Sequence, residues 1–341
     1  MAVVLEPATL LAIILLGYLF KRFGLFKPLD YRVLQTAEFN LILPGAIIFS
    51  FATNPHDPGL LLVSGFALVA SLVPPLAIYL TSRGRSVGHR AFLMLNGSGF
   101  NIGCFCFPML QSLLGPAALV PAAMFDIGNN IMVAAGTNVM TQGLLHIKRG
   151  ETLERDEAPG QEGTDGRVRS VPPVRVDDHD ARNLRYRAIL TNIAKGFFGS
   201  VSFDTYMVML VLMLAKVALP DWVAQVSQPF ASANAFCSMF MVGMLMDLPA
   251  SGRDVKEVAQ VLAWRIPFGI IFALTAWFLL PFGPLVRQAV ALCCLAPTAI
   301  FATMFTDKVL GNARLAGFTL ALTAFCSTIL MILAHLVMGP V

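Results

Sequence analysis

The sequence predicts an all-α membrane protein with ten transmembrane helices. These form two inverted five-helix repeats, in which the fourth and ninth helices are broken and cross each other. Three observations support this fold: an apolar composition, the clustering of charge, and an alternation of basic connections between apolar stretches. Hydrophobic residues make up 57% of the 341-residue chain and charged residues 13%, whereas an average soluble domain is roughly a quarter charged. With a mean hydropathy of +0.72, this composition excludes a soluble nucleic-acid-binding protein, a secreted disulfide scaffold and a coiled coil.

Ten stretches are long and apolar enough to cross a bilayer, which takes roughly 20 residues of helix. They cover residues 3–20, 33–51, 60–80, 91–113, 119–145, 201–219, 230–247, 257–280, 286–306 and 314–337. The first contains Glu6 and has no Lys or Arg before it, so we interpret it as a membrane span and not as a signal peptide.

One polar segment divides the chain. Residues 148–187 hold 18 of the 44 formal charges, are rich in Gly and Pro, and contain no aromatic residue except Tyr186. Such a segment cannot bury a core, so we expect a linker. The predicted organisation is a first repeat at 1–147, a polar cytoplasmic insert and an interfacial segment at 148–200, and a second repeat at 201–341. Five spans in each half give the halves opposite orientations, as in inverted-repeat transporters.

Basic residues alternate between successive connections. The odd-numbered connections hold 21 of the 24 Lys and Arg, the even-numbered ones hold only Arg287, and Lys216 and Arg265 lie within apolar stretches. Lys and Arg mark cytoplasmic loops. We therefore expect an integral protein of the bacterial inner (cytoplasmic) membrane, with both termini outside.

Two apolar stretches contain helix-breaking residues at matching depth. Residues 96–108 include three glycines, two asparagines and Pro108, and residues 294–299 include Pro297 and Thr298. Asn101 and Pro297 lie ten and eleven residues into their stretches. Paired interruptions indicate a substrate site near the midplane, where half-helix N-termini face an anion. The alternative is that these residues only allow helices to bend and pack closely.

Several motifs carry a family resemblance. They are Phe39-Asn40-Leu41-Ile42-Leu43-Pro44, then Asn101, Gly103, Cys106 and Pro108 followed by Gly115, then Phe125-Asp126-Ile127-Gly128-Asn129-Asn130, and Ala296-Pro297 with Asp307 ten positions later. In these the chain resembles the auxin efflux carrier family, whose fold is related to that of the bile acid sodium symporters. Cys106 and Thr298 depart from a Gly and a Pro that are common there. The resemblance covers nearly all of the chain outside the insert. It implies ten helices in a panel and a crossover domain, and transport of organic anions by alternating access.

Polar residues near the breaks are the candidate site. The predicted substrate-binding residues are Asn101, Gly103, Pro108, Pro297, Thr298 and Asn40. Asp126, Asn129 and Asn130 are candidates for ion or proton coupling, since carboxylates inside membranes are functional by default. For each Asn the alternative is an interhelical hydrogen bond, and Asp126 could instead lie at the outer interface. Arg265 is expected to extend to the cytoplasmic interface, which leaves the helix dipoles to supply positive potential.

The six cysteines all lie in apolar stretches, where we expect free thiols that behave as small hydrophobic groups. Cys104, Cys106, Cys293 and Cys294 lie in the broken helices, so a soft-metal pathway is an alternative. No cluster of His or Met accompanies them, and no metal site is predicted.

These features predict a secondary transporter for a small organic anion, expected to be a carboxylate, and not an enzyme. No paired carboxylates or His motif suited to catalysis occur within the apolar stretches. The alternatives are a sodium-coupled organic anion symporter of the bile acid type and a soft-metal transporter. The expected partners are the anion and the lipid bilayer, with no nucleic acid and no cofactor beyond a coupling proton or sodium ion. Assembly as a homodimer is left open.

Overall fold

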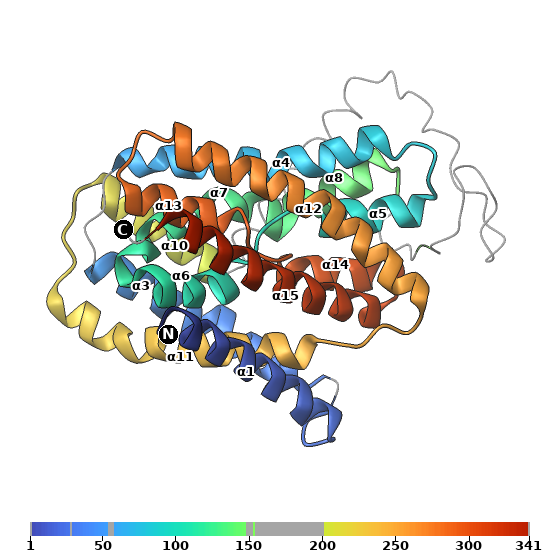
Figure 1. The fold of residues 1–341 in the computed structure, drawn as a ribbon. Helices are drawn as coiled ribbons and strands as arrows, with labels where there is room; N and C mark the ends of the chain where they lie inside the picture. The colour runs from blue at the N-terminus through green and yellow to red at the C-terminus, as the bar shows by residue number, and fades with distance from the viewer. Residues whose placement is uncertain (1, 28, 54–57, 148–152, 154–200, 340–341) are drawn as a thin grey trace, which may run out of the picture.

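The computed structural model describes residues 2–27, 29–53, 58–147, 153 and 201–339 (Figure 1). Within these ranges all regular secondary structure is helical, so the prediction of an all-α protein is confirmed. Five continuous runs are long and apolar enough to cross a membrane: Tyr31–Thr53, Pro58–Thr81, Pro116–Leu144, Gly252–Leu279 and Ala313–Met338. They indicate an integral membrane protein. The insert, apart from Leu153, and the predicted interfacial segment at 188–200 lie outside the described residues.

The first half of the chain contains several helices that change type along their length. They are α1 (Ala2–Arg22), α2 (Tyr31–Ala37) with the π-helical turn η1 (Glu38–Ile42) and α3 (Leu43–Thr53), η2 (Pro58–Leu60) with α4 (Leu61–Thr81), α5 (Val87–Asn96), the π-helical η3 (Ile102–Cys106) with α6 (Phe107–Leu114), η4 (Pro116–Ala118) with α7 (Leu119–Ile131), and the π-helical η5 (Met132–Gly136) with α8 (Thr137–Leu144). Short π-helical segments within helices occur frequently at functional sites.

The second half contains α10 (Val201–Leu214), α11 (Asp221–Leu245), α12 (Gly252–Leu279), α13 (Pro284–Cys293), α14 (Ile300–Leu310) and α15 (Ala313–Met338). Two of these helices begin earlier than the hydropathy pattern predicts. α11 begins at Asp221 instead of residue 230. α12 begins at Gly252 instead of residue 257, because Ser251 and Asp254 form a capping box that satisfies the first N–H groups.

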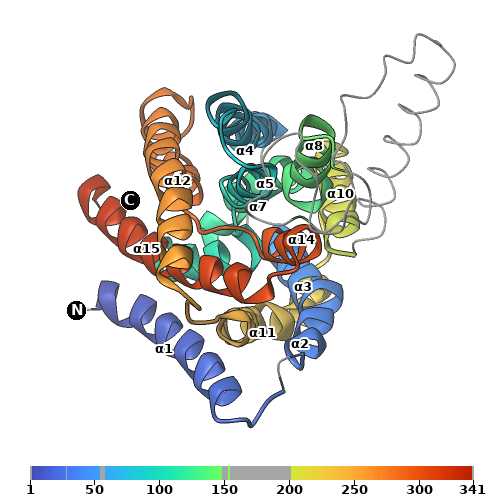
Figure 2. The same ribbon diagram turned by 90° about the vertical axis from the view of Figure 1, so that its right-hand side faces the viewer.

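The helices pack as two groups that lie side by side (Figures 1 and 2). The α11 bundle consists of α1, α2–α3, α10 and α11, and α11 packs most extensively against α1 and α3. The broken-helix bundle consists of α4–α8 and α12–α15, in which α4 packs on α7, α12 on α13, and α14 on α15 and α5. Small residues allow the closest approaches: a Cβ added at Gly17 would overlap the Phe240 carbonyl, and one at Gly128 would overlap the Ser64 carbonyl. Each bundle is therefore tightly packed within itself.

Candidate functional site

Two helices of the broken-helix bundle are interrupted in the protein interior, where the sequence predicts breaks. α5 ends at Asn96 and the chain becomes helical again at Ile102, while α13 ends at Cys293 and α14 begins at Ile300. Every residue of the two non-helical segments, 97–101 and 294–299, is buried. Gly99 adopts a left-handed conformation with φ of 67°, which a residue with a side chain rarely adopts.

The two breaks contact each other directly. The backbone N–H of Asn101 donates a hydrogen bond to the Pro297 carbonyl oxygen at 3.0 Å. The Thr298 hydroxyl lies 3.4 Å from the Asn96 carbonyl oxygen and is fully buried. Two segments about two hundred residues apart in sequence thus provide hydrogen-bond partners for each other's backbone groups, which lipid could not do.

Arg265 of α12 binds backbone carbonyl oxygens on one side of this crossing, its carbonyl side. Its guanidinium donates hydrogen bonds to the carbonyl oxygens of Asn96 at 3.1 Å, Ser98 at 3.2 Å and Ala296 at 2.9 Å. It also lies over the Phe100 ring, 5.4 Å from the centroid. The expectation that Arg265 extends to the cytoplasmic interface is wrong. The freed carbonyls at the C-terminal ends of α5 and α13 carry partial negative charge, and an inward-pointing guanidinium offsets it.

A small cavity lies on the opposite side of the crossing. It measures about 40 Å³ and is lined by the first residues of η3 and of α14, together with residues of α7, η1 and α10 (Phe39, Leu43, Phe100–Cys104, Asp126, Asn130, Val133, Ser202 and Ala299–Phe301). Two helix N-terminal ends therefore face one cavity. The positive dipole ends of these helices favour an anion. The Asn101 side chain is 5% exposed, and its amide nitrogen has no hydrogen-bond partner among the described residues.

Asn129 holds the first break against α7. Its amide oxygen accepts hydrogen bonds from the Phe100 N–H at 2.9 Å and the Ser71 hydroxyl at 3.1 Å. Its amide nitrogen donates to the Phe100 carbonyl at 2.8 Å and to the Asp126 carboxylate at 2.9 Å. The hydroxyl of Tyr206 from α10 donates to the other Asp126 oxygen at 2.8 Å. Asp126 is thus 7% exposed, inside the protein, and joins the two bundles.

The other predicted site residues differ in their positions. Gly103 lies at the start of η3 under Leu43, where an added Cβ would come 2.8 Å from a Leu43 methyl group. Pro108 is buried in the first turn of α6. Asn130 lines the small cavity. Asn40 does not: its side chain is exposed and donates to the Thr36 carbonyl oxygen at 2.8 Å.

A much larger vestibule of about 790 Å³ opens between the two bundles. It is lined by the ends of α1 and α11, the start of α2, and parts of α14 and α15 (Tyr18, Lys21, Arg22, Leu29, Tyr31, Arg32, Gln35, Met244, Leu245, Asp247, Leu248, Thr303, Met304, Asp307, Ala313, Arg314, Ala316 and Gly317). Lys21 and Asp247 form an ion pair at its edge, 3.0 Å apart.

An aromatic pair lines the small cavity, close in sequence to residues that line the vestibule. The rings of Phe39 and Phe301 contact each other with centroids 5.3 Å apart, and both residues line the small cavity. Gln35, one turn before Phe39, and Thr303, two residues after Phe301, line the vestibule.

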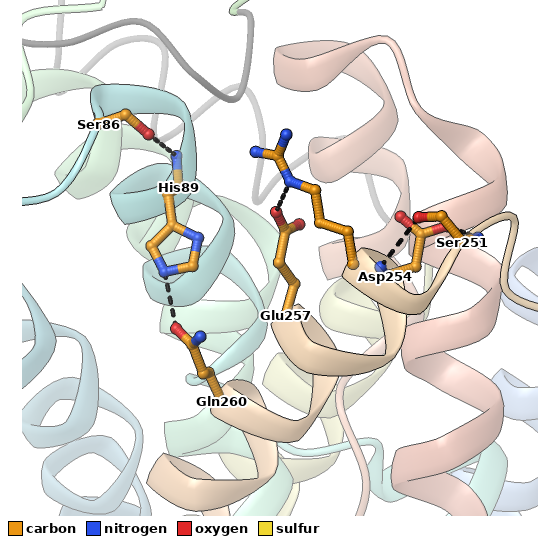
Figure 3. Close-up of polar contacts among 7 residues, drawn as sticks. Ser86, His89, Ser251, Asp254, Glu257 and Gln260 are labelled. Carbon is orange, nitrogen blue, oxygen red and sulfur yellow. Dashed lines mark hydrogen bonds and ion pairs between the residues drawn. The ribbon is translucent and has the colours of Figure 1, made fainter.

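A network at one end of the broken-helix bundle fixes α5 on α12 (Figure 3). The His89 ring contacts the Gln260 amide oxygen at 2.9 Å, and Arg253 pairs with Glu257 at 3.0 Å (Figure 3). The Ser86 hydroxyl caps α5 by accepting from the His89 N–H. Because Arg265 follows Gln260 on α12, this contact helps to position the guanidinium at the break.

One residue that the motifs did not identify is Glu38. It belongs to η1, its exposed fraction is 0%, and neither of its carboxylate oxygens has a hydrogen-bond partner among the described residues. The sequence does contain a signal, because Glu38 is the only charged residue in the apolar stretch 33–51.

Comparisons with known proteins add no assignment: neither a protein-family model nor a curated protein sequence matches the chain. In the described part of the chain, no group of three or more His, Cys, Asp or Glu is arranged to hold a metal ion. The nearest cysteine contact joins the sulfurs of Cys106 and Cys293 at 3.7 Å. The site offers hydrogen-bond donors and helix ends around a small cavity.

Proposed function

We propose that the protein is a secondary transporter, similar to the auxin efflux carriers, that moves a small organic anion across the cytoplasmic membrane. The anion is a carboxylate, and the mechanism is alternating access. In this proposal ten spans form two inverted repeats, with α5–η3–α6 and α13–α14 as the broken fourth and ninth spans. The observation that carries the proposal is the small cavity, where the N-terminal ends of η3 and α14 meet. Beside them lies the amide nitrogen of Asn101, which has no hydrogen-bond partner among the described residues.

The electrostatics of the crossing favour an anion on the cavity side. A carboxylate there would accept a hydrogen bond from the Asn101 amide nitrogen and would face the positive ends of the two helix dipoles. Arg265 lies on the carbonyl side, where it offsets the negative helix ends and leaves the positive ends facing the cavity. The cavity volume of about 40 Å³ is roughly three times what one water needs. It suits a carboxylate group, with the rest of the substrate directed towards the vestibule.

The arrangement of the two bundles supports alternating access. Both the small cavity and the vestibule are lined by residues of both bundles, so movement of one bundle against the other would change both. The connections around Lys21 and Arg314 carry the positive charge that marks the cytoplasmic side. We therefore propose that the vestibule opens towards the cytoplasm.

The test is uptake into proteoliposomes that contain the full-length protein. Radiolabelled benzoate, lactate and succinate would be offered with and without sodium and pH gradients. We expect at least one of them to be transported. A hydrogen bond to a charged group contributes about 1.5–3 kcal/mol, so Asn101→Ala should weaken apparent affinity at least about tenfold.

Asn138→Ala is the matched control, because the Asn138 side chain accepts a part-buried hydrogen bond from Gln142 within α8 and does not line the small cavity. If Asn101→Ala transported as well as Asn138→Ala, the site assignment would be wrong. If the wild type transported none of the carboxylates under any gradient, the proposed function would be wrong. Dependence on sodium would identify the bile acid symporter type of coupling.

A further inference from the structure

The carboxyl group of Glu38 is buried inside a predicted membrane span and has no hydrogen-bond partner among the described residues. The turn that carries it, η1, lies between α2 and α3 and packs against α10 and α11. The exposed fraction of Glu38 is 0%, and both carboxylate oxygens lack hydrogen-bond partners among the described residues. Protein, and not lipid, therefore covers this carboxyl group.

The surroundings of Glu38 do not compensate a negative charge. The groups that interact with it electrostatically are the thiols of Cys104 on η3 and Cys237 on α11. α3 has no titratable residue. α10 contributes Asp204 and Tyr206, and the Tyr206 hydroxyl already binds Asp126.

Charged groups on α2 do not reach Glu38 either. Arg32 lines the vestibule almost two turns earlier, and no described cation forms an ion pair with the Glu38 carboxyl group. An isolated buried carboxylate is very costly, so the neutral acid is the favoured form in this conformation.

Glu38 lies one turn from a residue that lines the vestibule and is linked mechanically to the crossing. Gln35, one turn earlier on α2, lines the vestibule. Leu43, the first residue after η1, packs against Gly103 at the start of η3. Asn234 on α11 donates to the Gly103 carbonyl at 3.4 Å, and its own amide oxygen is buried without a partner among the described residues. Movement of η1 therefore connects exposure of Glu38 with the geometry of the first break.

We propose that Glu38 is a proton-binding site, separate from the anion cavity, that carries the coupling proton of transport. The carboxyl group holds the proton while α10 and α11 cover it. When η1 moves towards the vestibule, one proton passes from the carboxyl oxygen to water and leaves a hydrated carboxylate, with no change of oxidation state. The coupling role rests on the proposed transport function, whereas binding of the proton does not.

Carbodiimide labelling tests proton binding without any transported substrate. Dicyclohexylcarbodiimide modifies carboxylic acids that are protonated in apolar surroundings. The full-length protein in lipid nanodiscs would be labelled over a range of pH and digested, and modification of Glu38 and Glu257 would be measured by mass spectrometry. Glu257 is the internal control, because its carboxylate is also buried but pairs with Arg253.

We expect Glu38 to react at least about tenfold faster than Glu257, because the Glu257 carboxylate is held in an ion pair with Arg253, and to react more slowly as the pH rises. Equal rates at the two residues would overturn the proposal. So would protection of Glu38 by sodium chloride and not by choline chloride, because that result would identify a sodium site.

Transport by Glu38→Gln tests the coupling role. Glutamine resembles the protonated acid in shape and charge, so the variant should exchange labelled for unlabelled carboxylate across the vesicle membrane as the wild type does. It should lose accumulation driven by a pH gradient. Accumulation that persists in Glu38→Gln would refute coupling through Glu38, and so would a loss that occurs only in Asp126→Asn. Absence of exchange in the wild type would instead refute the proposed function, and the labelling result would still stand.

Discussion

Asn129 provides the sharpest test of the structure around the first break. Its side chain is fully buried and makes four hydrogen bonds. Two of them bind the N–H and the carbonyl of Phe100, a residue between helices whose carbonyl also accepts a hydrogen bond from the Ile102 N–H at 3.1 Å. Replacing Asn129 by alanine would leave both backbone groups, the Ser71 hydroxyl and one Asp126 oxygen without these partners.

The expected cost follows from the number of bonds. Hydrogen bonds inside membranes contribute about 0.6 kcal/mol each on average, which gives about 2 kcal/mol for four. Two neutral groups, the Phe100 N–H and the Ser71 hydroxyl, would lose their hydrogen bond to Asn129 without access to solvent, at about 1–3 kcal/mol each, which gives an upper value of about 6 kcal/mol. Asn129→Ala should therefore lower the apparent melting temperature in detergent by at least about 3 °C.

Asn130→Ala is the matched control for this measurement. Asn130 is the next residue on α7 and lines the small cavity, but its side chain makes no hydrogen bond with a described residue. Melting would be followed by the loss of the monodisperse peak in size-exclusion chromatography after heating. If Asn129→Ala melted at the temperature of Asn130→Ala or higher, the network around Asn129 would contribute nothing to stability, and the reasoning would be wrong.

Two further predictions concern helix packing. Gly128→Ala should disrupt the contact of α7 with α4 and destabilise the protein by about 1–3 kcal/mol or more, because the added Cβ would overlap the Ser64 carbonyl. Gly143→Ala, at an open position, should leave the melting temperature unchanged or raise it, and an equal loss in both variants would contradict the packing. In a double-mutant cycle of thermal stability, Lys21→Ala and Asp247→Ala should show a coupling of about 0.2–1 kcal/mol, since both partners are partly exposed; a coupling above this range would refute the estimate.

The breaks themselves could be predicted from the sequence, because their cause is local. Gly97, Gly99 and Pro297 are poor helix formers wherever they stand, so the positions of the interruptions follow from residue type. The contact between the two breaks could be expected only from their matching depth. The individual hydrogen bond from Asn101 to Pro297 depends on how the two bundles are assembled, which residue spacing does not determine.

The role of Arg265 could not be predicted from α12 alone. A long basic side chain two turns into a span has two ways to satisfy its charge, at the interface or on carbonyl oxygens inside the protein. The choice depends on the Asn96 and Ala296 carbonyls, which other helices present. In the same way, the sequence shows Glu38 as a charge in an apolar stretch. Only the packing of α10 and α11 shows that its carboxyl group has no hydrogen-bond partner among the described residues.

The separate roles of backbone and side chains at the crossing have a consequence for substrate specificity. If the small cavity binds an anion as proposed, its positive potential would come from peptide groups at two helix starts, and these persist whatever side chains line the space. Substitutions at lining positions such as Val133 or Phe301 can therefore change the size and shape of the molecule that fits without altering the sign of the charge that is accepted. Selectivity for charge would then depend on the backbone, whereas selectivity for shape would depend on the side chains that line the cavity.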